Sequence, residues 1–73
     1  MNSEQIASGE TAKTLRLIRL AEVKRLTGMS RSTIYRWMST GNFPQSYTLG
    51  GRMAAWSQAE IDAWILRTLD RAP

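Results

Sequence analysis

The residues best suited to chemistry in this chain are arginines that can grip a planar anion or a base edge with two hydrogen bonds. Arg31 and Arg36 lie five positions apart, and Tyr35 lies between them. A guanidinium group presents its donors in a fixed fork that matches phosphate oxygens and the edge of guanine. Arg52 follows Gly50-Gly51, where an arginine could enter the minor groove of DNA or clamp the backbone beside it. These residues favour binding of a polyanion.

Side chains for catalysis are scarce. The 73 residues contain no cysteine and no histidine, which removes thiolate nucleophiles, imidazole bases and most transition-metal sites. Glu60 and Asp62 are close in sequence, but two positions apart on a helix they point about 200° away from each other. We therefore expect no enzyme activity, no metal, no cofactor and no small-molecule ligand.

Positive charge is concentrated in the middle of the chain. Ten basic and six acidic residues give a net charge of +4 and a pI near 10.4. Between residues 13 and 52 only Glu22 opposes eight basic residues, so this window carries +7, and both flanks are net acidic. Such a surface attracts nucleic acid through phosphate contacts and counterion release. The alternative is a solvated face that only keeps the protein soluble.

Length and hydropathy predict one small domain. Hydrophobic residues make up 42% and charged residues 22% of the chain, which is close to globular averages. No apolar run approaches 18 residues and the N-terminus lacks the apolar stretch of a signal peptide, so we expect a cytoplasmic protein without a membrane partner. We expect a flexible tail over residues 1–14, a folded domain over 15–70 and a frayed end over 71–73.

Two short helices are predicted in the first half of the domain, after a short strand within residues 15–19. The first helix spans Leu20 to Thr27 and ends at Gly28, a natural left-handed stop. The second runs roughly from Arg31 to Thr40, with Ser30 as its N-cap and Gly41 ending it. One arc of this helix holds Ile34, Trp37 and Met38, whereas the opposite arc holds Arg31, Ser32, Tyr35, Arg36 and Ser39.

The second half predicts a hairpin and a third helix. Residues 47–49 and 52–56 read as short strands around a two-residue turn at Gly50-Gly51, because a primed turn needs positive φ. Ser57 and Glu60 have the spacing of a capping box. The helix that they open has four apolar residues on one face: Ile61, Trp64, Ile65 and Leu69.

Two helices joined by a tight glycine-containing turn are typical of a helix-turn-helix, whose second helix docks in the DNA major groove. The wedge between the helices is expected from Val23, Met29, Ile34 and Trp37. We interpret Trp37, Trp56 and Trp64 as core residues, not as a stacking platform for single-stranded nucleic acid.

Residues 17–66 strongly resemble the AlpA family of prophage regulators, which are related to excisionases and to the helix-turn-helix part of MerR-like regulators. The resemblance is carried by six stretches: Leu20-Ala21-Glu22-Val23, Thr27 to Arg36, Gly41-Asn42-Phe43-Pro44, Leu49-Gly50-Gly51-Arg52, Trp56, and Glu60-Ile61 with Trp64. It implies a mostly helical α+β fold, a small winged helix-turn-helix with three helices and a short hairpin wing. It also implies that the second helix and the wing both bind DNA.

The candidate site residues fall into two groups. We expect base contacts from the second helix at Arg31, Ser32, Tyr35 and Arg36. We expect contacts to the DNA backbone or from the wing at Lys24, Arg25, Ser30, Thr33 and Arg52. Two alternatives stay open: Tyr35 covers the hydrophobic seam, and Ser30 acts only as a helix cap.

The sequence therefore predicts a protein that binds double-stranded DNA as a prophage-type transcriptional regulator or an excisionase-like architectural factor. One helix in one groove reads few base pairs, so we expect further copies on adjacent sites, or help from an integrase or the transcription machinery. The alternative is a protein-interaction module, in which Arg31, Tyr35 and Arg36 dock on an acidic surface of an integrase, a polymerase subunit or a signalling protein.

Overall fold

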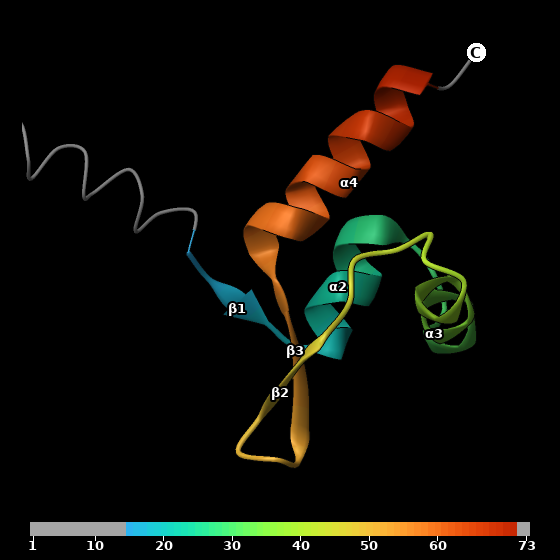
Figure 1. Ribbon diagram of the computed structural model, residues 1–73. Coiled ribbons are helices and arrows are strands. Elements are labelled where there is room, and N and C mark those ends of the chain that lie inside the picture. The colour runs from blue at the N-terminus through green and yellow to red at the C-terminus, as the bar shows by residue number, and fades with distance from the viewer. Residues whose placement is uncertain (1–14, 72–73) are drawn as a thin grey trace, which may run out of the picture.

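The computed structural model describes residues 15–71, which form three helices and three strands (Figure 1). The predicted N-terminal tail lies outside the described residues, as do the last two residues of the predicted frayed end. In chain order the elements are β1 (Leu17–Ile18), α2 (Leu20–Thr27), α3 (Arg31–Ser39), β2 (Tyr47–Leu49), β3 (Met53–Ser57) and α4 (Gln58–Arg71).

The three strands form one antiparallel sheet in the order β1-β3-β2. The hairpin pairs Tyr47 with Ala55 and Leu49 with Met53, and β1 pairs Ile18 with Trp56. The central strand is thus both one arm of the hairpin and the link to the first strand of the domain. Because β3 runs directly into α4, the hairpin is tied to the rest of the fold at its base.

Every element except β2 contributes a buried residue to one core. Trp56 is its largest member and has no exposed surface. Around it the core gathers one residue from β1, from each helix and from the α3–β2 loop: Ile18, Val23, Ile34, Phe43 and Ile61. A core this small fixes the angle between α2 and α3 with few contacts, so each buried side chain carries a large share of the stability.

Both predicted glycine stops are confirmed. Gly28 has a φ of +74° and its N–H donates to the carbonyl of Lys24 at 2.8 Å. Gly41 has a φ of +79° and donates to Met38, while Asn42 donates to Trp37. The second pair of bonds is the Schellman arrangement, which satisfies carbonyls left free at a helix end. At the end of α2, the Gly28 bond fixes the short turn of three residues, 28–30, that leads into α3.

Two details of the prediction are wrong. The second helix ends at Ser39, one residue early, because Thr40 is already in the cap. The hairpin connection includes Arg52, whose N–H closes the turn onto Leu49 at 3.1 Å, so β3 begins one residue later than expected. On the apolar face of α4, Leu69 is 66% exposed, because it lies in the last turns of the helix, beyond the core.

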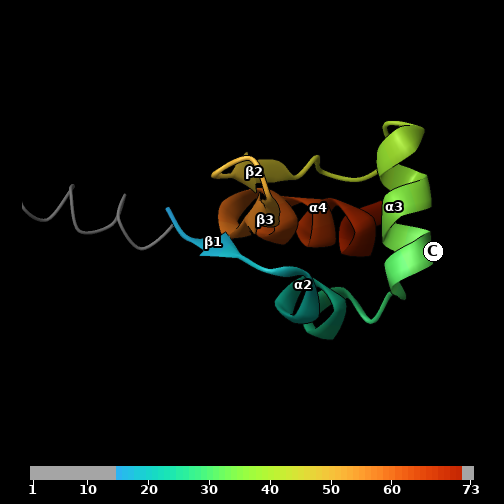
Figure 2. The same cartoon turned by 90° about the horizontal axis from the view of Figure 1, so that it is seen from below.

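The fold class is confirmed: three helices and a short hairpin make a small α+β winged helix-turn-helix. Seen from below, α2 and the hairpin both lie to one side of α3 (Figure 2). Among residues 15–71, no helix has the length and apolarity needed to cross a membrane.

We predict that Ile34→Ala lowers the free energy of unfolding by about 2–5 kcal/mol, because the fully buried side chain leaves a cavity behind α3. Urea unfolding followed by tryptophan fluorescence measures this change. Arg36→Ala on the exposed side of the same helix is the control and should shift stability by no more than about 0.5 kcal/mol. Equal losses in the two variants would contradict this assignment of the inner face.

Candidate nucleic-acid interface

The outward side of α3 carries most of the predicted base-contact residues. Arg31, Ser32 and Arg36 are exposed. The Arg31 guanidinium lies 5.0 Å from the centre of the Tyr35 ring, within the range of a cation–π contact. This contact restrains Arg31 without using any of its N–H donors, which stay available for an incoming acceptor.

Tyr35 is only half exposed, and it differs from its neighbours in what it touches. Its ring meets Trp56 edge-on with 6.1 Å between centroids, a favourable aromatic geometry. Tyr35 thus covers the hydrophobic seam, which is the alternative to a base contact that the sequence left open. Tyr35 thus connects the exposed Arg31 to the centre of the core.

Ser30 caps α3, as predicted. Its hydroxyl oxygen accepts the Thr33 N–H at 3.3 Å, and its own hydrogen is donated to the Thr33 hydroxyl at 3.0 Å. Ser30 is exposed and Thr33 is half-buried. The two side chains therefore satisfy each other at the helix start, where free backbone N–H groups also favour a negative charge.

An aromatic stack holds the C-terminal end of α3. Trp64 of α4 lies 4.8 Å from Phe43 and 6.2 Å from Trp37 between ring centroids, and its indole N–H donates to the Asn42 carbonyl at 2.9 Å. Trp37 was expected in the core but remains 37% exposed. It lies in the last turns of α3, so only its inner side has Trp64 to pack against. The predictions for Trp56 as buried and Trp64 as packing against the core are confirmed.

The two basic residues of α2 differ in their partners. Lys24 and Arg25 are both exposed. Arg25 forms a two-pronged ion pair with Glu22, with Nε to Oε1 at 3.1 Å and Nη2 to Oε2 as the second contact. Hydrogen bonds from Arg25 hold the pKa of the Glu22 carboxyl below its usual range. The charge of Arg25 is therefore already neutralised by Glu22, whereas Lys24 has no ion-pair partner among residues 15–71.

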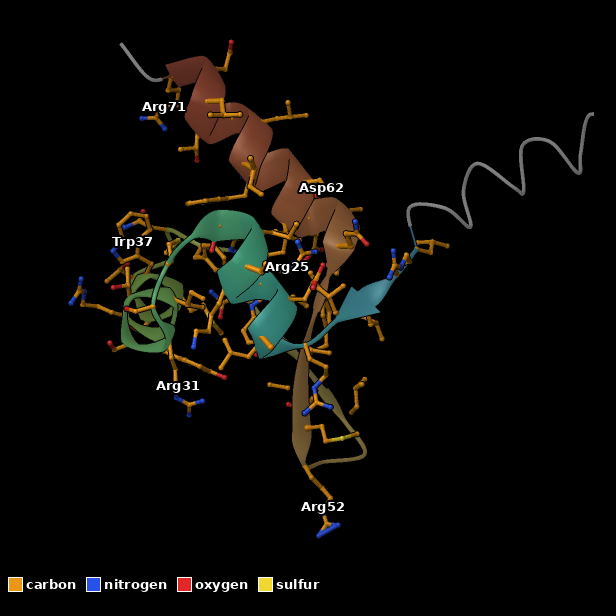
Figure 3. The ribbon with its side chains drawn as sticks, turned by 180° about the vertical axis from the view of Figure 1, so that it is seen from behind. Arg25, Arg31, Trp37, Arg52, Asp62 and Arg71 are labelled. Atoms are coloured by element: carbon orange, nitrogen blue, oxygen red, sulfur yellow. The ribbon has the colours of Figure 1, made fainter. Side chains whose placement is uncertain are left out.

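The hairpin presents Arg52 at its tip, pointing away from the body (Figure 3). Gly50 and Gly51 both have positive φ, which is the geometry that a primed hairpin turn requires. Arg31 projects toward the same side of the molecule as Arg52, while Arg71 lies at the opposite end of the structure (Figure 3). The fold thus brings the start of α3 and the hairpin tip onto one face.

Arg19 is a positioning residue that the sequence analysis missed. Its Nε donates to the Ala54 carbonyl at 3.1 Å, and its Nη1 lies 3.5 Å from the Met53 sulfur. It therefore ties the start of α2 to the hairpin strand β3. The only signal in the sequence was its place in the basic window, which does not separate a surface arginine from one that spans two elements.

Glu60 completes only half of the expected capping box. Ser57 Oγ accepts the Glu60 N–H at 3.3 Å, as predicted. The Glu60 carboxylate, however, accepts a hydrogen bond from the Tyr47 hydroxyl at 2.9 Å. This bond raises the pKa of the Tyr47 phenol. Glu60 thus pins β2 to the first turn of α4, a partner 13 positions away that local spacing does not reveal.

Comparison with known proteins places this arrangement in a family. Residues 16–69 match the family described as Prophage CP4-57 regulatory protein (AlpA). This chain belongs to the AlpA family. The match covers all three helices except the last two residues of α4, together with the complete hairpin. Membership confirms the resemblance drawn from the sequence motifs.

Two curated proteins are similar to the chain over most of its length. The DNA-binding transcriptional activator AlpA of Escherichia coli K12 is 39% identical over 57 residues, which cover 70% of this chain and 81% of the relative. An uncharacterised protein, ORF88 of enterobacteria phage P4, is 46% identical over 50 residues, which cover 68% of this chain. The chain spans 57% of the length of that phage protein.

We predict that Arg19→Ala loosens the hairpin while leaving the helices in place, because the two contacts from Arg19, just before α2, to β3 disappear. Amide hydrogen exchange measures the effect as faster exchange at the β2–β3 pairs, with little change in α3. Arg16→Ala, another exposed arginine beside β1, is the matched control. Unchanged hairpin exchange in Arg19→Ala would contradict the positioning role.

Proposed function

We propose that this AlpA-family chain binds double-stranded DNA and regulates transcription of prophage genes. The observation that supports this proposal is that the exposed start of α3 and the hairpin tip share one face. Arg31 and Arg52 project toward the same side of the molecule (Figure 3). In this mode α3 lies in the major groove and the hairpin acts as a wing on the backbone or in the minor groove. The description of the E. coli relative as a DNA-binding transcriptional activator supports the same role.

The burial of the site residues suggests how the work is divided. Arg31 and Arg36 are exposed on a helix held from behind by buried Ile34, so the helix backbone is fixed while both side chains are free to reach base edges. Tyr35 supports Arg31 through its ring, which also packs against Trp56. Lys24 and Arg52 neutralise phosphates, because long exposed side chains at the rim suit contacts that carry no sequence information.

The proposed role is binding. Within residues 15–71, no group of three or more residues with carboxylate, thiol or imidazole side chains is arranged to hold a metal ion. An excisionase-like architectural role uses the same face and differs in bending the duplex. An integrase or the transcription machinery is the partner class that such a regulator would meet on DNA.

We predict that Arg31→Ala and Arg36→Ala each weaken binding to a duplex site selected from a random library by about 1–3 kcal/mol and relax selectivity at one base pair. Lys24→Ala and Arg52→Ala should weaken binding to all duplexes alike and flatten the salt dependence by about 0.9 per lost phosphate contact. Fluorescence anisotropy over a salt series measures both effects.

Arg71→Ala is the control for these four variants, because Arg71 lies at the end of the molecule opposite Arg31 and Arg52. It should bind like the parent protein. Losses of similar size for all five variants, blind to sequence, would overturn the division between base and phosphate contacts. Absence of any complex at low ionic strength would overturn the proposed function itself.

A second prediction concerns Glu22, which competes with phosphate for Arg25. Glu22→Gln should tighten binding to any duplex and steepen the salt dependence by about 0.9, because Arg25 becomes free to meet a phosphate. Adding Arg25→Ala to Glu22→Gln should remove the gain. Glu60→Gln removes the same charge from α4, and an equal gain there would show that net charge alone is responsible.

A further inference from the structure

An open groove of about 710 Å³ lies between α4 and the loop that follows α3. One wall is formed by residues 41–45 of this loop, and the other is a single face of α4. On that face Glu60, Trp64, Arg67 and Arg71 follow one another at spacings of three or four positions, which places them on one stripe of the helix. We call this feature the α4 groove. None of the residues assigned above to DNA contacts lines it.

The loop wall of the α4 groove is held in place by hydrogen bonds. The Trp64 indole N–H donates to the Asn42 carbonyl at 2.9 Å, and the Gln45 side-chain amide donates to the Met38 carbonyl at 2.8 Å. Phe43 is buried and meets the Trp64 ring edge-on. A wall fixed in this way needs little further ordering when a ligand binds, so less binding free energy is lost.

The chemistry of the α4 groove changes along the helix. Pro44 and Trp64, both half-buried, form an apolar centre. Arg67 and Arg71 form a cationic end, since both are exposed and neither forms an ion pair within residues 15–71. Glu60 lies at the other end, about 10 Å from Arg67 along the helix axis, and its carboxylate already accepts a hydrogen bond from β2. The other two carboxylates of α4 do not line the groove.

We propose that the α4 groove binds an acidic segment of a partner protein, with an apolar side chain on Trp64 and carboxylates on Arg67 and Arg71. The cationic end selects for negative charge. The two arginines follow Trp64 by three and seven positions, which is about 5 Å and about 10 Å along the helix axis. Alternate side chains of an extended segment lie about 6.5 Å apart on one side. An apolar residue with two carboxylates at the next alternate positions therefore matches this spacing, because arginine side chains are long.

A protein segment fits this surface better than nucleic acid does. A duplex presents phosphates in continuous rows, whereas α4 carries three carboxylates against two arginines and Glu60 lines the groove itself. Arg71 also lies at the end of the molecule opposite Arg31 and Arg52 (Figure 3). The groove therefore stays open while those two arginines hold DNA, a point that rests on the proposed function.

An NMR titration of the isotope-labelled full chain, without DNA, tests the proposal. The probes are two end-capped synthetic peptides, Phe-Ser-Glu-Ser-Glu and its reverse, which present the same side chains in the two chain directions. With at least one of them, the Trp64 indole signal and the amides of residues 42–45 should shift and saturate, with a dissociation constant of about 1 mM at about 0.1 M salt. The indole signal of fully buried Trp56 should not move.

Matched variants test the role of charge. Arg67→Ala/Arg71→Ala should weaken peptide binding by about fivefold, because two exposed ion pairs are lost. Peptides with glutamine in place of both glutamates should lose the same factor on the parent protein. Arg31→Ala/Arg36→Ala removes two exposed charges from α3 instead, and its affinity should stay within about twofold of the parent because distant charges are screened. An equal loss in this control would overturn the assignment to the α4 groove.

Duplex binding separates a protein partner from nucleic acid. Arg67→Ala/Arg71→Ala should bind duplex DNA like the parent protein over a salt series. A weaker complex with a flatter salt dependence would show that these arginines hold phosphates, and it would overturn the proposal.

Three results with the peptides would also overturn it: a Trp64 indole signal that does not move at about 10 mM of either peptide, glutamine peptides that bind as tightly as the acidic ones, or shifts confined to α3. The last would show that the peptides only mimic phosphate. Because the titration contains no DNA, these outcomes leave the proposed DNA-binding role standing, and failure of DNA binding leaves the titration intact.

Discussion

Burial of Trp56 is the interaction on which the rest of the structure depends. It lies on β3, the strand that forms the hairpin, pairs with β1 and leads into α4. Its side chain is fully buried, and Tyr35 of α3 packs edge-on against it. One indole therefore sets where the hairpin stands relative to α3, and with it the spacing between Arg52 and Arg31.

The energetics explain why a tryptophan serves here. Within the described residues its indole N–H has no acceptor, and leaving such a donor unpaired costs about 1–3 kcal/mol. Burying about 150–250 Å² of ring at about 25 cal/mol per Å² contributes about 4–6 kcal/mol. Area outweighs the missing hydrogen bond, so the residue is used for its volume. The core that it fills is built from five elements, β1, α2, α3, β3 and α4, together with Phe43 of the loop.

Much of this fold could be predicted from the sequence, because the decisive signals are local. Gly28 and Gly41 indicate where the helices end, and Ser30 indicates where α3 begins. Each of these residues acts on backbone groups only a few positions away along the chain. The misses share a different cause, since they depend on partners distant along the chain. Glu60 bonds Tyr47, and Arg19 bonds Ala54 across 35 positions. Helical periodicity places Leu69 on the apolar face of α4, but it does not reveal that the core ends before that turn of the helix.

Of the candidate site, the sequence identified which residues are polar and cationic, and the structure adds which of them are already engaged. Arg25 is bound to Glu22, Tyr35 is partly in the core, and Ser30 and Thr33 satisfy each other. The exposed and unencumbered donors are thus fewer than composition suggests, chiefly Arg31, Arg36, Lys24 and Arg52. Two or three base contacts worth about 1–3 kcal/mol each discriminate poorly among the many sites of a genome. A domain with so small a reading surface needs additional binding free energy from outside that surface.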